Sequence, residues 1–361
     1  MFTRAAQRMG YHVVVVDPDP QAPAGKIAFK HIALPYDDAK VWSALQGCAA
    51  VTTEFENVPV SLMEKLERWV RVTPPSRAVA IAQNRILEKK AIQKAQLPIA
   101  PFAIIESESD LNTVSPLFPG ILKTATLGYD GKGQIVINNK EELRNAFFTL
   151  KKVPCVLEKK ITLKKEASVI ITRLNQKDYQ IFSVIDNVHH EGILFTSTVP
   201  SKLSASMQQD LKKAALHLAE NLDYVGVLTV EFFIDQQDRI YVNEIAPRPH
   251  NSGHYSLDAA LADQFEAQVK ILCGLSPPSP SLLCSATMVN LLGDLWPAKG
   301  QPDWGFLLQN PKVKLHLYGK KVARKGRKMG HFTLLSEEKN NHHIDELREQ
   351  AIVLWQNLNK V

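Results

Sequence analysis

The sequence lacks several features that would assign it to a common class. Its longest apolar runs, such as the valines 13–16, have only the length of a strand, so we expect no membrane span. Its four cysteines include no CxxC pair, which favours reduced, mostly buried thiols over a disulfide framework. The start of the chain lacks the long apolar stretch of a signal peptide. We therefore expect a cytoplasmic protein.

A strong single-sign charge pattern is also lacking. The formal net charge is +6, but the basic residues are spread along the chain, apart from a cluster at 320–328. We expect no nucleic-acid partner, because this balance also suits a protein that binds polyphosphate and a phosphorylated substrate. The cluster itself is explained either by a solvated loop or by a contact to substrate.

The length of 361 residues exceeds what one compact core holds and predicts two or three domains. Strand-like and helix-like segments alternate at first, and longer strands follow, which predicts mixed α/β and α+β architecture. We predict a Rossmann-like domain over 1–80, a larger domain over 81–280 with a subdomain at about 97–160, and a small β-rich domain over 281–361. That last domain ends in a helix at 344–358.

The first domain opens on a predicted helix at 1–9 and continues into a strand at 12–16. A βαβ unit normally starts with a strand and a glycine turn, so we expect this unit to lack both. Farther on, Ser61 and Glu64 have the spacing of a capping box and predict a helix that starts at Ser61.

Two carboxylates mark a candidate metal site. Strands predicted at 226–234 and 239–245 are joined by a four-residue turn, which pairs Ile234 with Arg239 and places Glu231 opposite Val242. Glu244 is then a diagonal neighbour on the same face. A divalent cation such as Mg²⁺ would relieve the repulsion, and Asn243 could add an amide oxygen. The alternative is a solvated sheet face.

A second candidate is the glycine-rich segment 128–134, which follows Lys123. Glycines let the backbone close over phosphates, and the segment does not match a Walker A loop. An ordinary glycine-rich hairpin is the alternative.

Two polar runs complete the candidates. The run 248–254 contains Arg248, suited to an oxyanion, and His250, which could move a proton or polarise an intermediate. The run 158–161 could hydrogen-bond a purine edge. Polar or surface loops are the alternatives for both.

In order along the chain, the strings LKT, GYDGKGQ, NVHHEGIL, VGVLTVEFF, VNEIAPRPHNSGH and GRKMGH resemble N5-carboxyaminoimidazole ribonucleotide synthetases. The resemblance covers nearly the whole chain from about Val13. It implies a three-domain ATP-grasp enzyme, usually a homodimer, that joins bicarbonate to the amine of 5-aminoimidazole ribonucleotide while ATP becomes ADP and phosphate.

The resemblance also implies residue roles. The ATP site would comprise Arg85, Lys123, Gly128, Tyr129, Asp130, Gly131, Lys132, Gly133, Gln134, Glu158, Lys159, Lys160, Ile161, Glu166, His189, Asn243 and Glu244. Mg²⁺ would bind Glu231 and Glu244, helped by Asn243. The aminoimidazole and carboxyphosphate would face Tyr129, Arg248, His250 and Lys328.

The chain departs from the family pattern at two points. The family usually begins with a strand and a glycine loop that would bind the substrate phosphate, and it usually has arginines where this chain has Ala125 and Thr126. Two alternatives therefore stay open. One is a related ATP-grasp ligase that uses formate, and the other is a nucleotide-binding fragment with impaired catalysis.

Overall fold

The computed structural model describes residues 1–114, 117–126, 128, 133–337 and 343–358. The glycine-rich candidates Tyr129, Asp130, Gly131 and Lys132 lie outside the described residues. No helix in the described part of the chain has the length and apolar character needed to cross a bilayer.

The N-terminal region consists of short helices around two separate parallel strand pairs, β1 with β2 and β3 with β4. Its elements are α1 (Phe2–Arg8), β1 (Val14–Val16), β2 (Lys30–Ile32), α2 (Ala39–Gln46), β3 (Ala50–Thr52), α3 (Val60–Leu66) and β4 (Arg71–Thr73). The predicted capping box is wrong, because α3 begins one residue earlier, with Pro59 at the N-cap and no side-chain cap bond.

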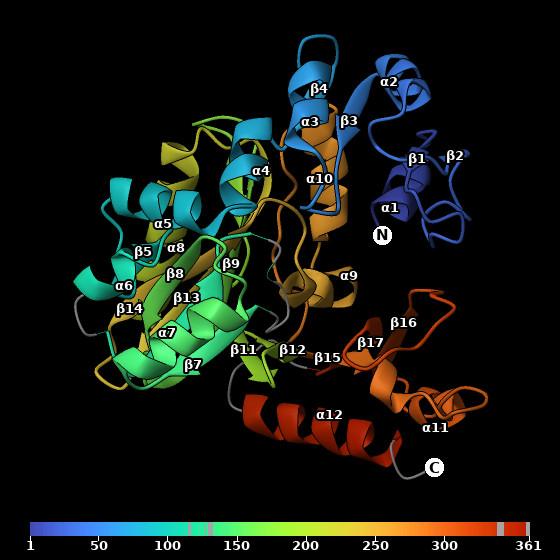
Figure 1. Ribbon diagram of the computed structural model, residues 1–361. Coiled ribbons are helices and arrows are strands. Elements are labelled where there is room, and N and C mark those ends of the chain that lie inside the picture. Colours follow the sequence, from blue (N-terminus) through green and yellow to red (C-terminus); the bar gives the residue numbers. More distant parts are fainter. Residues whose placement is uncertain (115–116, 127, 129–132, 338–342, 359–361) are drawn as a thin grey trace.

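A four-stranded antiparallel sheet forms a separate lobe, with strand order β5-β8-β6-β7. Its elements are β5 (Phe102–Ile105), α6 (Asp110–Thr113), β6 (Gly120–Thr124), β7 (Gln134–Ile137), α7 (Lys140–Thr149) and β8 (Cys155–Lys159). Helix α7 covers one face of this sheet (Figure 1) and buries Leu143, Ala146 and Phe147 against it. Two helices, α4 (Ser76–Ala82) and α5 (Arg85–Lys94), connect this lobe to the N-terminal region.

The largest sheet has nine strands in the order β14-β13-β9-β11-β12-β15-β17-β16, with β10 on β9. Its strands are β9 (Leu163–Arg173), β10 (Tyr179–Ile181), β11 (Ile185–His190), β12 (Ile193–Val199), β13 (Gly226–Asp235), β14 (Ile240–Ala246), β15 (Ala286–Leu292), β16 (Val313–Leu317) and β17 (Lys328–Leu335). Residues 179–185 do not form one continuous strand, because β10 ends at Ile181 and the β11–β12 hairpin starts at Ile185.

Helices cover this sheet on several sides (Figure 1). They are α8 (Ala205–Asn221), α9 (Ser256–Ala259), α10 (Gln264–Leu272), α11 (Trp304–Leu308) and α12 (Ile344–Leu358), with 3₁₀ turns η1 (Asn251–Tyr255) and η2 (Gly293–Leu295). The apolar face of α8 recurs with helical periodicity, and its Leu211, Ala215 and Leu218 are fully buried in the main core. Each such leucine contributes about 2 kcal/mol of burial free energy.

A histidine cluster joins the C-terminal strands to the segment after β14. The buried His331 ring lies 4.7 Å from the ring of His316 and 4.9 Å from that of His254. The Tyr318 hydroxyl is 2.8 Å from His331 Nδ1, and His316 Nε2 is 2.8 Å from an oxygen of Asp258. Burial holds the pKa of His331 and of His254 well below the usual range, so both rings are neutral near pH 7. The tilted contact between the neutral rings of His331 and His254 thus packs this part of β17 against η1.

Candidate active site

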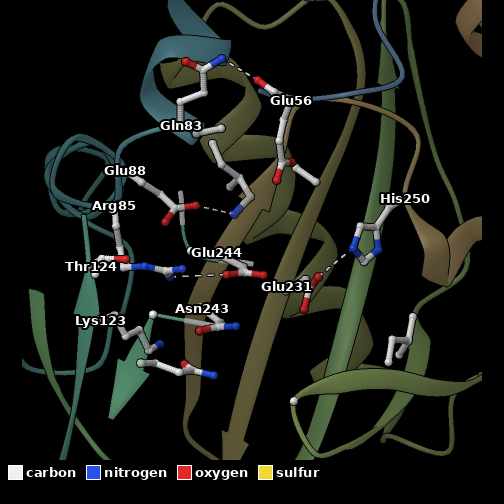
Figure 2. Close-up of a pocket in the computed structure, with 18 of the residues that line it drawn as sticks. Glu56, Gln83, Arg85, Glu88, Lys123, Thr124, Glu231, Asn243, Glu244 and His250 are labelled. Carbon is white, nitrogen blue, oxygen red and sulfur yellow. Dashed lines mark hydrogen bonds and ion pairs between the residues drawn. The ribbon is translucent and has the colours of Figure 1, made fainter. Parts of the chain in front are cut away.

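One polar cleft of about 760 Å³ lies between the four-stranded lobe and the large sheet. Its described walls come from β6, β9, β13 and β14, from α4 and α5, and from the loop after β3. Figure 2 shows Glu231, Asn243 and Glu244 at its centre, with Arg85 and Lys123 on one side and His250 on the other. Residues from all three predicted domains line this cleft. The third domain contributes Lys328 of β17.

The two central carboxylates face each other more directly than the sequence predicted. Asp235 accepts hydrogen bonds from the backbone N–H groups of Gln237 and Arg239, which lengthens the turn so that Ile234 pairs with Ile240. The predicted pairing of Ile234 with Arg239 is therefore wrong. A β-bulge follows and shifts the register once more.

As a result of the bulge, Glu231 lies opposite Glu244, not opposite Val242 as predicted. The bulged residue is Asn243, whose side chain lines the same cleft. Among the described residues, its Oδ1 is buried and has no hydrogen-bond partner. Two facing carboxylates and a buried, unpartnered amide oxygen form a set of hard oxygen donors that fits Mg²⁺.

Glu231 is held in its ionised form. Burial alone would raise the pKa of Glu231, but His250, His189 and Lys328 outweigh it and lower that pKa to about 2. His250 Nε2 lies 2.9 Å from the Glu231 carboxylate. Glu231 is therefore an anion at neutral pH, as a metal ligand must be.

Helix α5 positions the bulge through three charged residues, of which the sequence analysis named only Arg85 and missed Glu88 and Lys89. Lys89 is fully buried, and its Nζ donates to the Asn243 carbonyl at 2.9 Å. Glu88 accepts a hydrogen bond from the Ile245 backbone N–H at 2.7 Å. Arg85 lies 3.5 Å from the Glu244 carboxylate. The spacing 85, 88 and 89 puts three charges on one helix face, a signal that could have indicated this role.

Burial changes the ionisation of this helix face. Desolvation raises the pKa of Glu88 to about 7, although Arg85 and Lys89 oppose the change. The pKa of Lys123 is lowered because the residue is buried, despite its carboxylate partner. The cationic side of the cleft thus contains groups whose charge is sensitive to what binds there.

Glu158 lies beneath this side of the cleft. Its carboxylate is 3.1 Å from Lys123 Nζ and 3.2 Å from Lys89 Nζ. Burial opposes ionisation, but the two lysines outweigh it and lower the pKa of Glu158 to about 2. The N–H groups of Lys159 and Lys160 donate to the carbonyls of Pro101 and Pro119.

The run 158–161 is not among the residues that line the cleft. Its proposed contact with a purine therefore stays a prediction. Gly128, Gly133 and Gln134 do line the cleft, as do Ala125 and Thr126.

The remaining predicted residues occur as ion pairs around the cleft. Glu166 lies 2.7 Å from His189 Nδ1, and this carboxylate raises the pKa of His189 although burial opposes it. Arg248 lies 2.8 Å from Glu56, a residue of the loop after β3.

The sequence analysis also missed part of the cleft lining, namely Phe55, Glu56 and Asn57 of the loop after β3, and Gln83. Nothing in the local sequence pattern of that loop places it beside β14. Gln83 donates to the carbonyls of Glu56 and Val58 and so fixes the loop at the cleft.

Three family models match consecutive parts of the chain. They are described as "Ribonucleotide synthetase preATP-grasp domain" (1–83), "ATP-grasp domain" (90–265) and "Phosphoribosylaminoimidazole carboxylase C-terminal domain" (286–344). The fold and these matches define an ATP-grasp ligase, which confirms the predicted fold class.

Individual relatives agree. The N5-carboxyaminoimidazole ribonucleotide synthase of Bacillus subtilis (strain 168) is 38% identical over 364 residues, covering 99% of this chain and 92% of that protein. The N5-carboxyaminoimidazole synthetase of Staphylococcus aureus complexed with ADP has a TM-score of 0.89 at 34% identity, covering 98% of this chain and 93% of that one. The Aspergillus clavatus enzyme in complex with ADP and 5-aminoimidazole ribonucleotide has a TM-score of 0.88 at 26% identity, covering 100% and 96%. The chain belongs to the family of N5-carboxyaminoimidazole ribonucleotide synthetases.

Proposed function

We propose that this chain carboxylates 5-aminoimidazole ribonucleotide with ATP and bicarbonate and forms N5-carboxyaminoimidazole ribonucleotide, ADP and phosphate. The observation that carries the proposal is the bulged pair of strands, which gathers Glu231, Asn243 and Glu244 in one cleft with Arg248 and His250. The similar Aspergillus clavatus structure is described as a complex with ADP and this ribonucleotide, which supports the choice of substrates.

The chemistry explains the composition of the cleft. Bicarbonate is a poor electrophile, and phosphorylation by ATP converts it into carboxyphosphate, which can deliver CO₂ to the amine. Negative charge develops on the phosphate oxygens, and prearranged cations stabilise it most effectively in a site that excludes water. Arg85 and Lys123 supply that charge on the nucleotide side.

Mg²⁺ fits the oxygen donors of Glu231, Asn243 and Glu244, and when bound it would neutralise phosphate charge. The N-terminal turn of α5 keeps the backbone of these donors in place through Glu88 and Lys89. His189 and Glu166 form the opposite wall and would contact the nucleotide.

The substrate side is proposed to comprise Arg248, His250 and Lys328, together with Tyr129. In the structure Arg248 is paired with Glu56. An incoming oxyanion would compete with Glu56 for the guanidinium, so this pair would open or rearrange when substrate binds. His250 already faces Glu231 and the cleft centre.

We also propose a homodimer in the cytoplasm. The homodimer comes from the resemblance alone. The cytoplasmic location agrees with four cysteines that are all free thiols, as is usual in a reducing compartment.

The testing experiment measures ADP release with ATP and Mg²⁺, with and without bicarbonate and the ribonucleotide. We expect release to need bicarbonate and to be strongly stimulated by 5-aminoimidazole ribonucleotide. Formate in place of bicarbonate serves as a control and should not support turnover. Tight ATP binding without any stimulation by the ribonucleotide would refute the substrate assignment.

A further inference from the structure

A buried chain of hydrogen bonds leads from the interior of the large sheet to His250. Its members come from β12, β11, β9 and η1, and each is at most 5% exposed. In order toward the cleft they are Ser197, Asn187, Ser168 and Ser252. None of these residues had a role in the cleft described above, and buried polar side chains that serve no purpose would destabilise the sheet.

The strand register builds this chain. Ser197 lies directly opposite Asn187 on neighbouring strands, and its hydroxyl donates to Asn187 Oδ1 at 2.8 Å. Asn187 Nδ2 donates to the Ser168 hydroxyl at 2.9 Å, and Ser168 donates to the Ser252 hydroxyl, also at 2.9 Å. Ser168 is in turn paired with Glu231 across β9 and β13. Asn187 lies opposite Glu166, so its side chain reaches Ser168 diagonally, and Ser168 connects the chain to the row that holds Glu231.

The contact between Ser252 and the His250 ring fixes which atom of each hydrogen bond is the donor. His250 is the N-cap residue of η1, and its Nδ1 accepts a hydrogen bond from the Ser252 backbone N–H at 3.3 Å. The Ser252 hydroxyl lies 2.8 Å from the same nitrogen. A backbone N–H can only donate, so Nδ1 must be an acceptor and carries no proton. Since Nδ1 then has no proton to offer, the Ser252 hydroxyl donates its one O–H to Nδ1 while it accepts from Ser168.

We infer that Ser252, Ser168 and Asn187 are positioning residues that hold His250 with Nδ1 as an acceptor and its one N–H at Nε2, which faces Glu231 in the cleft at 2.9 Å. This inference rests on the proposed function, in which His250 faces the carboxyphosphate. This tautomer decides between the two roles that the sequence left open for His250, moving a proton or polarising an intermediate. With Nδ1 accepting from Ser252 and the N–H at Nε2, His250 acts as a hydrogen-bond donor to an anion in the cleft, and not as the base that removes a proton. In this structure that anion is Glu231, and an oxyanion would compete for the same N–H when substrate is bound.

The direct test is the tautomer itself. Protein labelled with ¹⁵N-histidine is examined at pH 8 by long-range ¹H–¹⁵N correlation, and the His250 signals are assigned by their loss in His250→Gln. We expect the pattern of a ring that carries its proton at Nε2 and none at Nδ1. A ring protonated at Nδ1 would overturn the inference. This readout needs no turnover, so it stands even if the proposed reaction is wrong.

The functional test uses Ser252→Ala and Ser168→Ala. Loss of a residue that orients a site group through a hydrogen bond costs about 10- to 100-fold in activity. We expect Ser252→Ala to lower kcat in that range, with KM for ATP within about twofold of wild type, and to weaken the Nε2–H pattern. Ser168→Ala should also lower kcat, but by a smaller factor. It replaces Ser252→Ala as the test if Ser252→Ala does not fold.

The control is Ser256→Ala, on the same segment. Ser256 is 1% exposed, donates to the Gly253 carbonyl at 2.6 Å and accepts from the Gln264 N–H at 3.2 Å. Through Gln264 it is linked to the backbone of His250 but not to its ring. If Ser252 had only a structural role, Ser252→Ala and Ser256→Ala would lose the same stability and would have the same kcat and the same His250 tautomer. Equal kcat and an unchanged tautomer in Ser252→Ala and Ser256→Ala would therefore overturn the positioning role.

Discussion

The fully buried Lys89 offers the most informative single substitution. Its ammonium is 3.2 Å from the Glu158 carboxylate and donates to the Asn243 carbonyl at 2.9 Å. Lys89→Met keeps an unbranched side chain of similar length and removes only the charge and its donors. The change therefore tests whether this group holds the four-stranded lobe and the bulged strand together.

The expected magnitude follows from the partners left behind. Removing one partner of a buried ion pair costs about 3–5 kcal/mol, because the other charge stays buried without compensation. Here Glu158 keeps Lys123 at 3.1 Å, so the lower end of that range applies. The Asn243 carbonyl also loses a charged donor. We expect the free energy of unfolding to fall by about 3 kcal/mol, a large share of the roughly 5–15 kcal/mol typical of a folded protein.

Urea unfolding followed by circular dichroism measures this loss, with ΔG extrapolated to water. The Mg²⁺ concentration that gives half-maximal ADP formation provides a second readout, and we expect it to rise about tenfold because the bulge backbone is no longer anchored. Lys90→Met is the matched control, since Lys90 is the next residue of α5 and is exposed. Its effect should stay within about 0.5 kcal/mol.

The reasoning is refuted if Lys89→Met costs no more stability than Lys90→Met. If stability falls but the Mg²⁺ dependence is unchanged, only the proposed anchoring of the strand that carries the metal donors is contradicted. The two readouts therefore separate the ion pair with Glu158 from the hydrogen bond to Asn243.

Three further predictions concern the cleft and the histidine cluster. Glu244→Ala should abolish ATP turnover, by about 100-fold or more, because one of the two facing carboxylates is lost; near-normal ADP release would contradict the metal assignment. Arg248→Ala should keep ATP affinity, measured by calorimetry, and lose carboxylation, whereas lost nucleotide affinity would show that its role was misassigned. Burial holds the pKa of His331 below its usual range, so the unfolded chain takes up the proton first and stability falls as pH drops below about 6.5. His331→Gln should reduce this acid-side slope by up to about 1.4 kcal/mol per pH unit in urea titrations at pH 7 and 5.5, and an unchanged slope would count against a neutral buried ring.

The sequence by itself determined the family and most of the secondary structure. The strings GYDGKGQ and NEIAPRPHNSGH carried the resemblance that the relatives confirm. Helices with one apolar face, such as α8 and α12, follow from periodicity within a single segment. Local chemistry of this kind needs no information from the rest of the chain.

Only the tertiary structure decided how the site is assembled. The register that sets Glu231 opposite Glu244 depends on the Asp235 turn and on a bulge held from outside by Lys89. The approach of Glu56 to Arg248 and the chain from Asn187 to His250 join segments that are far apart in sequence. Such contacts depend on packing between lobes and on strand order in the sheet, which no local pattern encodes.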